Sequence, residues 1–284
     1  MVCWQMTHKF VVGLVQMSST NEVAENMAAA ESFIREASAR GAQLILTPEM
    51  TTLIEHDRAA LLSKIHLQES DPSLPKFQAL AQELKVWLVI GSMAIKVADD
   101  AGDKVANRSF VISPKGEIVS YYDKIHMFDV DLPGGELYRE SRSYQAGARA
   151  VAAKTPWGDL GLTICYDLRF PYLYRKLAQA GAGMITVPAA FTAVTGAAHW
   201  HILLRSRAIE NGAFIFAPAQ TGSHVSARGA VRKTYGHSLL VDPWGNIIDD
   251  GGVDVGVIVA EVDLSLVDKA RSRIPSWHHD REFT

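Results

Sequence analysis

The chain has 284 residues, of which 48% are apolar, and its formal net charge is −3. This length allows a large buried core, and the charge gives no electrostatic reason to bind nucleic acid or an anionic membrane. No apolar run reaches the roughly 20 residues of a membrane-spanning helix, and the N-terminal stretch lacks the features of a secretory signal. The two cysteines lie far apart and form no disulfide framework, so we expect a cytoplasmic protein.

Predicted strands and helices alternate along the chain. Short apolar runs predict strands at residues 10–16, 43–46, 86–91, 184–187, 214–217 and 255–262. Turn residues between shorter runs predict hairpins at residues 105–122, 151–164 and 238–248. Capping residues, prolines and glycines delimit predicted helices at residues 21–40, 75–84, 171–181, 197–211 and 264–273. A segment rich in glycine and charge predicts a loop at residues 129–147.

This alternation predicts one α/β domain whose mixed sheets are covered by helices. No period of 20–50 residues repeats, and no Gly/Ser linker divides the chain. The first eight residues and the segment after Pro275 are predicted to be tails or arms.

Most sequence motifs of common enzyme classes are missing. The chain contains no G-x-S-x-G, Walker, G-x-G-x-x-G or C-x-x-C motif. Histidines stand close together only at His199–His201 and at His278–His279. Because residues i and i+2 of a helix face different sides, His199 and His201 make a poor metal-binding pair, and zinc-ligand spacings are missing. We therefore expect neither a metal nor a cofactor.

Cys165 follows the apolar run at residues 160–164 and precedes Asp167 and Arg169. A strand end next to a helix start is a place where the pKa of a thiol can be lowered, and the thiolate is the nucleophilic form. The alternative is a buried core cysteine, which is common in folded proteins.

Glu49 and Lys124 also stand at the ends of predicted strands. Each has a simple alternative: Glu49 as a solvated loop residue or a neighbour of a helix cap, and Lys124 as a surface lysine paired with Asp123 or Asp129. Open α/β sheets, however, place their sites at the carboxyl ends of strands. Carboxylate, ammonium and thiol also form a coherent set: a base, an oxyanion partner and a nucleophile.

The stretches LTPE (46–49), YDKIH (122–126) and ICYDLRFP (164–171) resemble the nitrilase superfamily of carbon-nitrogen hydrolases. The resemblance covers residues 10–274. It implies a four-layer α-β-β-α sandwich and a catalytic triad of Glu49, Lys124 and Cys165, with Glu140 as a second glutamate near the lysine. It also implies a homodimer.

Four further stretches narrow the resemblance to the branch that contains ω-amidases and deaminated-glutathione amidases. They are TGAAHW (195–200), LLRSRAIEN (203–211), YGHS (235–238) and VDPWG (241–245). Nitrilases proper have Cys-Trp-Glu at the nucleophile, and the Cys-Tyr-Asp found here argues against nitrile hydrolysis. The implied organisation is an N-terminal tail (1–8), one hydrolase domain (9–274) and a C-terminal arm (275–284) packed across the partner subunit.

The activity implied is release of ammonia from a small carboxylate-bearing amide through a thioester. Lys124 and the backbone N–H of Tyr166 would hold the oxyanion. Glu140 would orient Lys124, or would form only a plain salt bridge with it. The place of Arg169 resembles the carboxylate clamp of related carbamoylases, and its alternative is a structural pair with Asp167 or Glu210.

Phe191, Thr192 and Thr195 follow the strand at residues 184–187 and are candidates to line the substrate pocket, the alternative being simple loop packing. The expected partner is a small-molecule amide. Two other functions stay open: an N-carbamoyl-amino-acid hydrolase of the same superfamily, and a catalytically silent dimer that serves as a scaffold.

Overall fold

The computed structural model describes residues 8–98, 104–132 and 135–284. All of the predicted N-terminal tail except His8 lies outside the described residues. Two six-stranded sheets form the centre of the molecule. The first sheet has the order β16 (Gly256–Asp263), β1 (Lys9–Gln16), β2 (Leu44–Leu46), β3 (Trp87–Lys96), β4 (Val105–Ile112), β5 (Ile118–Asp123).

The second sheet repeats this mixed architecture. Its order is β15 (Ile247–Asp250), β14 (Leu239–Val241), β11 (Phe214–Ala217), β10 (Met184–Thr186), β9 (Gly158–Leu162), β8 (Val151–Thr155). In both sheets the central strands pair in parallel and the outer strands pair antiparallel. The parallel strands therefore direct their carboxyl ends toward the same edge of each sheet.

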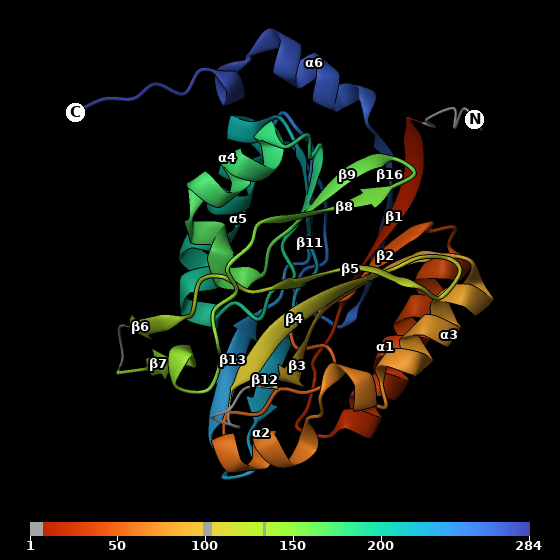
Figure 1. The fold of residues 1–284 in the computed structure, drawn as a ribbon, viewed down its shortest axis with the longest axis vertical. Helices are drawn as coiled ribbons and strands as arrows, with labels where there is room; N and C mark the ends of the chain where they lie inside the picture. Colours follow the sequence, from red (N-terminus) through yellow and green to blue (C-terminus); the bar gives the residue numbers. More distant parts are fainter. Residues whose placement is uncertain (1–7, 99–103, 133–134) are drawn as a thin grey trace.

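Helices cover the outer faces of the two sheets. Helices α1 (Val23–Ala39) and α3 (Leu74–Leu84) pack on the first sheet, and α4 (Pro171–Gln179) and α5 (Ala193–Asn211) pack on the second. In Figure 1 these pairs lie on opposite sides of the molecule with both sheets between them. The fold is therefore the four-layer α-β-β-α sandwich that the resemblance predicted. No helix in the described part of the chain combines the length and the apolar character that a membrane span requires.

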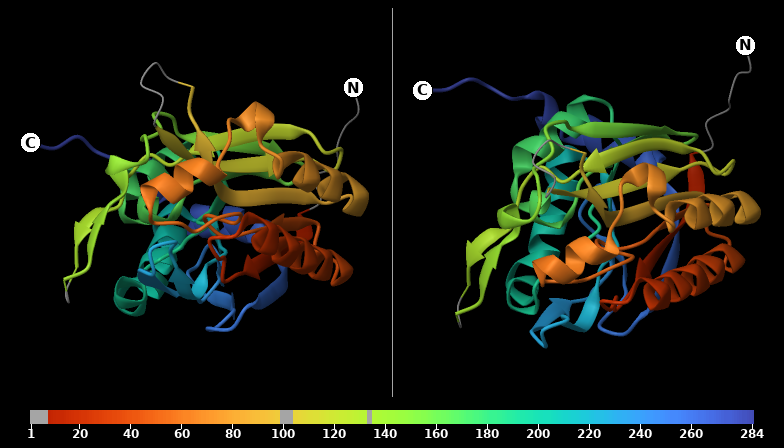
Figure 2. Two further views of the ribbon diagram at one scale, coloured as in Figure 1. Left: turned by 90° about the horizontal axis from the view of Figure 1, so that it is seen from below. Right: turned by 60° about the horizontal axis from the view of Figure 1, so that its bottom comes forward.

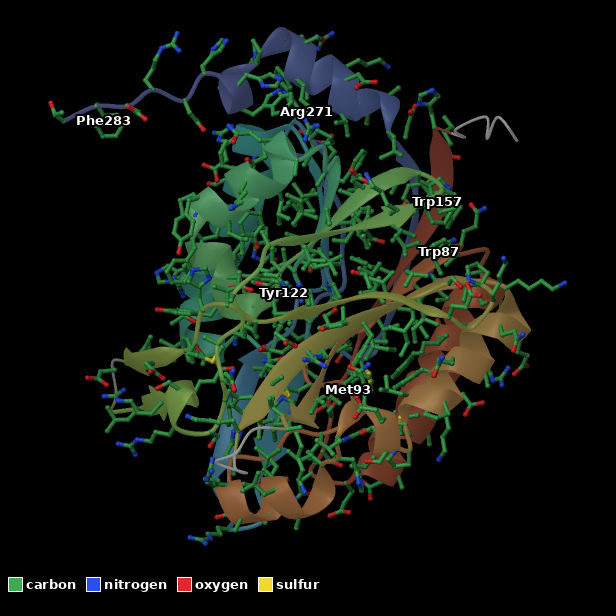
Figure 3. All side chains as sticks on the ribbon, in the orientation of Figure 1. Trp87, Met93, Tyr122, Trp157, Arg271 and Phe283 are labelled. Atoms are coloured by element: carbon green, nitrogen blue, oxygen red, sulfur yellow. The ribbon has the colours of Figure 1, made fainter. Side chains whose placement is uncertain are left out.

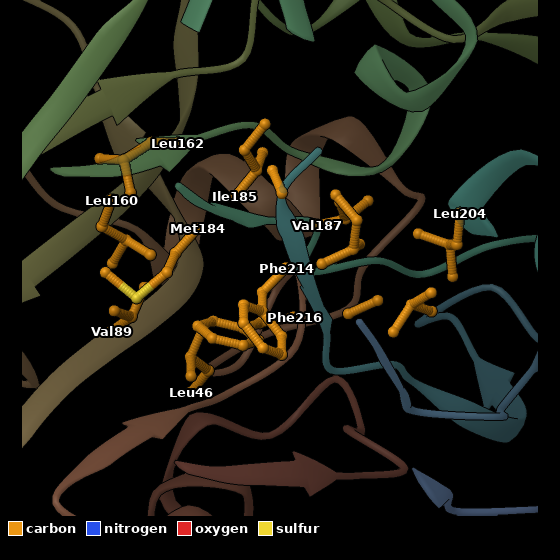
Figure 4. Packing of buried hydrophobic residues seen from close by; sticks show 14 of the residues in the cluster. Leu46, Val89, Leu160, Leu162, Met184, Ile185, Val187, Leu204, Phe214 and Phe216 are labelled. Carbon is orange, nitrogen blue, oxygen red and sulfur yellow. The ribbon is translucent and has the colours of Figure 1, made fainter. Parts of the chain in front are cut away.

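The alternation of side chains along the strands divides the core into layers. In β2, Leu44 and Leu46 face the second sheet, whereas Ile45 faces α1 and α3. In β3, Val89 likewise faces the second sheet. Figure 4 shows this inter-sheet layer, in which Leu46 and Val89 lie near Phe214 and other residues of the second sheet. Successive side chains of a strand point to opposite faces of the sheet. Because both faces are buried here, these strands appear in the sequence as continuous apolar runs.

Three short elements lie outside the two sheets and were not predicted. They are α2 (Arg58–Lys64), the hairpin of β6 (Asp129–Asp131) and β7 (Leu137–Arg139), and the hairpin of β12 (Thr221–Val225) and β13 (Val231–Tyr235). Figure 2 shows the β6–β7 hairpin extending from the body. Helix α5 begins at residue 193 rather than 197, because the side chain of Thr192 accepts the N–H of Thr195 and caps the helix there.

Helix α6 (Ser265–Arg273) crosses one end of the sandwich, and the chain then extends away from the body (Figure 3). Arg271 fastens α6 by donating to the carbonyl of Ala182 at 2.6 Å. The last residues pack little against the body, since Phe283 is 93% exposed.

Candidate active site

Glu49 is held where β2 passes close to β3. The Thr47 hydroxyl accepts the backbone N–H of Gly91 at 3.1 Å. A Cβ atom at residue 91 would lie 2.0 Å from the Thr47 carbonyl oxygen and 2.5 Å from Pro188. Only glycine allows this approach, which sets the direction in which the chain leaves β2 toward Glu49.

The carboxylate of Glu49 is buried, with 4% of the residue exposed, and hydrogen-bonded through both oxygens. Oε2 accepts the backbone N–H of Ala190 at 2.8 Å. Oε1 accepts Nδ2 of Asn107 at 2.8 Å and Nζ of Lys124 at 3.0 Å. Three donors from separate parts of the chain therefore fix the position of this carboxylate and favour its charged form.

Lys124 directly follows β5 and is 2% exposed. Its Nζ atom contacts both carboxylate oxygens of Glu140 at 2.9 Å, and Oε2 of Glu140 also accepts the N–H of Phe128 at 2.6 Å. The alternative of a surface lysine paired with Asp123 does not describe this residue, because Asp123 binds Arg108 instead.

Cys165 begins a short 3₁₀ helix, Cys165–Arg169, just after β9. Its φ of 48° lies in the left-handed region, which is unusual for a residue other than glycine. The backbone N–H of Cys165 donates to the carbonyl of Pro188 at 2.9 Å, and the residue lines the same cavity as Glu49. Backbone strain at a buried thiol is typical of a functional position.

Asp167 ties the thiol-bearing turn to the lysine-bearing strand. Its fully buried carboxylate accepts the N–H of Ile164 at 2.9 Å, the hydroxyl of Tyr122 at 2.7 Å and the N–H of His126 at 3.1 Å. Tyr122 and His126 flank Lys124 in the sequence, and Asp167 follows Cys165 by two residues. The YDKIH and ICYDL stretches are therefore joined through one carboxylate, which fixes the distance between the ammonium and the thiol.

Electrostatics leave the acid charged, the lysine charged and the thiol protonated. Burial opposes ionisation of Glu49, but the charges of Lys124 and Arg232 and its hydrogen bonds outweigh burial, so the pKa of Glu49 is lowered. Burial also opposes the charge of Lys124, but Glu140 and Glu49 raise its pKa well above the usual range. Burial and the Glu49 carboxylate raise the pKa of Cys165, whereas Lys124 acts in the opposite direction and is outweighed. The thiol therefore needs a base.

Glu49, Lys124 and Cys165 open onto a cavity of about 390 Å³, a size suited to a small organic ligand. The three elements outside the sheets, α2, β7 of the β6–β7 hairpin and β13 of the β12–β13 hairpin, contribute to its wall. In Figure 1, α2 and the β12–β13 hairpin lie at the bottom of the molecule and the β6–β7 hairpin at its left flank. Acid, lysine and thiol lie at the base, and aromatic and cationic side chains lie farther out.

The candidate substrate-binding residues occupy different positions. Phe191, Thr192 and Thr195 line the cavity, as does Tyr166. Arg169 is not among the lining residues; its guanidinium contacts Nδ1 of His199 at 3.2 Å and lies over the rings of Tyr166 and Phe191. Neither alternative pairing of Arg169 is found, because Asp167 binds Tyr122 and His126 and Glu210 binds Arg207 at 2.6 Å.

Two further residues of the site were not predicted. Asn107 interrupts the apolar strand β4 and is fully buried. A buried amide in an apolar strand needs a polar partner, and this signal could have pointed to Glu49. Arg232 lines the cavity, donates to the carbonyl of Ala190 and lies over the ring of Tyr138. Its sequence context is a polar segment in which arginines are usually solvated, so no pattern marked it.

The family model of carbon-nitrogen hydrolases matches residues 11–272, nearly the whole chain. The chain belongs to this family, the nitrilase superfamily. It is therefore a hydrolase of the amidase kind, which acts on C–N bonds other than peptide bonds.

Several relatives of this hydrolase are named deaminated glutathione amidase. The deaminated glutathione amidase of Yersinia enterocolitica is 40% identical over 271 residues, which cover 95% of this chain and 92% of the relative. The deaminated glutathione amidase of Synechocystis is 38% identical over 272 residues, or 95% and 97% of the two chains. The crystal structure of the Caenorhabditis elegans NitFhit protein matches with a TM-score of 0.87 and 34% identity, covering 98% of this chain and 66% of that one.

Proposed function

We propose that the hydrolase is a cysteine amidase of the deaminated glutathione type, which cleaves a carboxylate-bearing amide through a thioester. The observation that carries this proposal is the cluster of Glu49, Lys124 and Cys165 at the base of a cavity that also contains Arg232, with Lys124 hydrogen-bonded to Glu49. The names of relatives at 38–40% identity support the choice of substrate class.

In the first step the sulfur of Cys165 attacks the amide carbonyl carbon, and Glu49 takes the thiol proton. The raised pKa of Cys165 makes the thiol the resting form, and the lowered pKa of Glu49 keeps the base charged. Both groups line one cavity and the Glu49 carboxylate acts on the pKa of the thiol, so we assign the proton transfer to this pair.

The attack turns the carbonyl oxygen into an oxyanion. We assign its stabilisation to Nζ of Lys124 and the backbone N–H of Tyr166, and one such donor typically contributes roughly 3 kcal/mol. An ammonium has three N–H donors. Glu49 takes one, and Glu140 can share another between its two oxygens, both at 2.9 Å, which leaves one for the oxyanion. Glu140 is therefore a positioning residue.

The tetrahedral intermediate then collapses to a thioester. The C–N bond breaks, and protonated Glu49 gives its proton to the leaving amine. A water molecule next attacks the thioester, Glu49 takes a proton from it, and the acid product leaves as the proton returns to the sulfur of Cys165. The donors Ala190 and Asn107 keep the carboxylate in one place through these transfers.

We assign recognition of the substrate carboxylate to Arg232. Nε of Arg232 is buried and has no hydrogen-bond partner among the described residues, and a guanidinium binds a carboxylate through two parallel hydrogen bonds. Arg169 remains the second candidate, because its guanidinium lies over the rings of Tyr166 and Phe191, which line the cavity.

The leaving group depends on which amide is cleaved. In deaminated glutathione the scissile bond is a secondary amide, so hydrolysis releases cysteinylglycine, whereas a primary ω-amide releases ammonia. The cavity has aromatic walls at Phe128, Tyr144 and Tyr166, which suit a leaving group larger than ammonia. We therefore favour a peptide-like leaving group over the ammonia predicted from sequence.

The test compares kcat/KM of the purified chain on deaminated glutathione, 2-oxoglutaramate and N-carbamoyl amino acids. Cysteinylglycine, ammonia and carbon dioxide are measured separately, and Cys165→Ala is the blank. The proposal expects the highest kcat/KM on deaminated glutathione. A preference for 2-oxoglutaramate would make the chain an ω-amidase, and carbon dioxide release would make it a carbamoylase; either result rejects the substrate proposed.

We also propose that residues 9–274 act as one hydrolase domain and that the arm at 275–284 packs against a second copy. The exposed aromatic ring of Phe283 supports this role, since an isolated apolar side chain at a chain end gains from burial. Sedimentation equilibrium of the full chain and of a chain ending at Ile274 measures the effect. A monomeric full chain would reject the homodimer.

A further inference from the structure

His201, His237 and Asp250 meet away from the catalytic cavity. His201 lies in α5, His237 in the loop between β13 and β14, and Asp250 at the end of β15. Nε2 of His201 lies 3.0 Å from Oδ2 of Asp250, and Nδ1 of His237 lies 2.9 Å from Oδ1 and 3.2 Å from Oδ2. None of the three residues lines the cavity described above. Two imidazoles thus direct one nitrogen each at a single carboxylate.

The backbone holds these side chains in place. His237 has a φ of 55°, its N–H donates to the carbonyl of Gly252 at 2.6 Å, and its carbonyl accepts Nε1 of the fully buried Trp200 at 2.8 Å. Oδ1 of Asp250 accepts the N–H of Gly252 at 2.9 Å. The ring of His237 also stacks on Tyr235 with centroids 4.4 Å apart. The convergence is therefore built into a constrained turn.

The spacing of the donor atoms suits a small cation. One ligand atom from each residue can be chosen so that all three lie within 4.8 Å of one another. Bonds of about 2.0–2.1 Å in a tetrahedral zinc site place ligand atoms roughly 3.3 Å apart. The nitrogen–oxygen separations of 2.9–3.2 Å are close to that value and need only small side-chain rotations.

We propose that His201, His237 and Asp250 form a binding site for a divalent transition-metal ion, with zinc as the expected ion. Two of three donors are imidazole nitrogens, which favour zinc and its neighbours over magnesium or calcium. The side chains are 22–32% exposed, which leaves room for a water molecule as the fourth ligand. The ion replaces the hydrogen bonds between the two imidazoles and the carboxylate.

A metal here links α5 to the outer strands of the second sheet. Helix α5 starts at Ala193, between the cavity-lining residues Thr192 and Thr195, and carries His201 about two turns later. An ion that binds only the folded chain stabilises it by mass action. No sequence pattern marks this site, because the partners of His201 lie 36 and 49 residues away in the chain, and its close neighbour His199 contacts Arg169 instead.

The competing explanation is a hydrogen-bonded cluster without metal affinity. Untagged full-length protein is prepared with Cys3→Ala and Cys165→Ala, so that no thiol competes for the ion. Calorimetric titration with zinc chloride is then compared among this parent and versions that add His201→Ala, His237→Asn or Asp250→Asn. Asparagine is chosen at position 237 because it tolerates positive φ. His199→Ala is the matched control on the same helix.

We expect one zinc per chain in the parent and in the His199→Ala control. Each of the three ligand substitutions should weaken binding at least about tenfold. Zinc should also raise the Tm of the parent but not of the His201→Ala version, and cobalt should give the visible absorption of a four-coordinate site in the parent and in the His199→Ala control but in none of the three ligand-substituted versions. Folding of every version is checked by circular dichroism in EDTA. Absence of stoichiometric binding, or binding that survives all three substitutions, overturns the proposal.

Discussion

The base and the wall of the cavity are built in different ways. Glu49, Lys124 and Cys165, which we call the floor, are at most 6% exposed and directly follow strands of the two central sheets or lie within three residues of them. The part of the wall that we call the rim comes from α2 and the β6–β7 and β12–β13 hairpins, all outside those sheets. The layered core therefore positions the groups to which we assign the reaction, and peripheral segments surround the approach to them.

This difference separates two kinds of effect. The floor groups are fixed by backbone donors and by one another, so a change there alters the chemical step for every amide. Rim residues touch only those parts of a substrate that extend beyond the scissile bond, so a change there should depend on the substrate. Four substitutions test this separation.

The largest effect is expected for Cys165→Ala on the floor. Without the sulfur no thioester forms, and kcat should fall by a factor of about 10⁴ or more on every amide. The check is to measure product release from two amides, one that carries a carboxylate and one that does not. The Tm should stay close to that of the unaltered chain, because only one sulfur atom is lost. Retained turnover would reject the nucleophile.

Glu49→Gln should reduce kcat by a factor of about 10³, because the general base is lost while the shape is kept. The negative charge of Glu49 raises the pKa of Cys165, so its removal should lower that pKa. Thiolate absorbance near 240 nm, followed against pH with Cys165→Ala as blank, measures the shift.

The two readouts should therefore move in opposite directions: more thiolate at a given pH and far less turnover. This combination identifies Glu49 as a base rather than as a residue that merely adjusts the thiol. If the apparent pKa of Cys165 rises instead, the electrostatic account of the floor is wrong.

Glu140→Gln tests the boundary between floor and rim. Glu140 raises the pKa of Lys124, so its neutralisation should lower that pKa, although Glu49 still favours the ammonium. We expect kcat to fall about tenfold to a hundredfold with little change in KM, because Nζ loses one of its two carboxylates. Asp123→Asn, which removes a carboxylate bound to Arg108, is the matched control. An unchanged kcat with a lower Tm would mean that Glu140 forms only a structural salt bridge with Lys124.

The sequence predicted the floor because its signals are local. Buried strands such as β2 and β9 appear as apolar runs, and functional residues in α/β folds follow strand ends. What the sequence does not contain is the distance between those ends. That distance depends on Asp167, which links Tyr122 and His126 to the thiol-bearing turn, and on the absence of a side chain at Gly91.

The rim was largely missed because tertiary contacts build it. The β12–β13 hairpin has mostly polar residues and no clear apolar alternation. It is attached at both ends, since the N–H of Thr221 donates to Met17 and the N–H of Tyr235 donates to Phe191. Such long-range hydrogen bonds leave no period in the sequence, so Arg232 could not be placed beside the thiol before the fold was known.

Arg232→Lys is expected to have the most selective effect. Lysine keeps the positive charge near Glu49 and Cys165, on which their pKa values partly depend, but it loses the planar fork that binds a carboxylate. A hydrogen bond to a charged group contributes about 1.5–3 kcal/mol, so kcat/KM for a carboxylate-bearing amide should fall about tenfold to a hundredfold. For an analogue without that carboxylate, kcat/KM should stay within about twofold of the value for the unaltered chain.

Arg169→Lys is the matched comparison, because the two arginines compete for the same assignment. The loss of kcat/KM for the carboxylate-bearing amide could instead appear in Arg169→Lys and not in Arg232→Lys. In that case Arg169, the residue predicted from sequence, binds the substrate carboxylate, and the buried Nε of Arg232 has a structural role. If Arg232→Lys slows both substrates equally, its guanidinium acts on the floor rather than on the ligand, and the separation between floor and rim fails at this residue. Only one result supports the assignment of substrate selectivity to the β12–β13 hairpin: Arg232→Lys must lower kcat/KM for the carboxylate-bearing amide and leave it unchanged for the analogue.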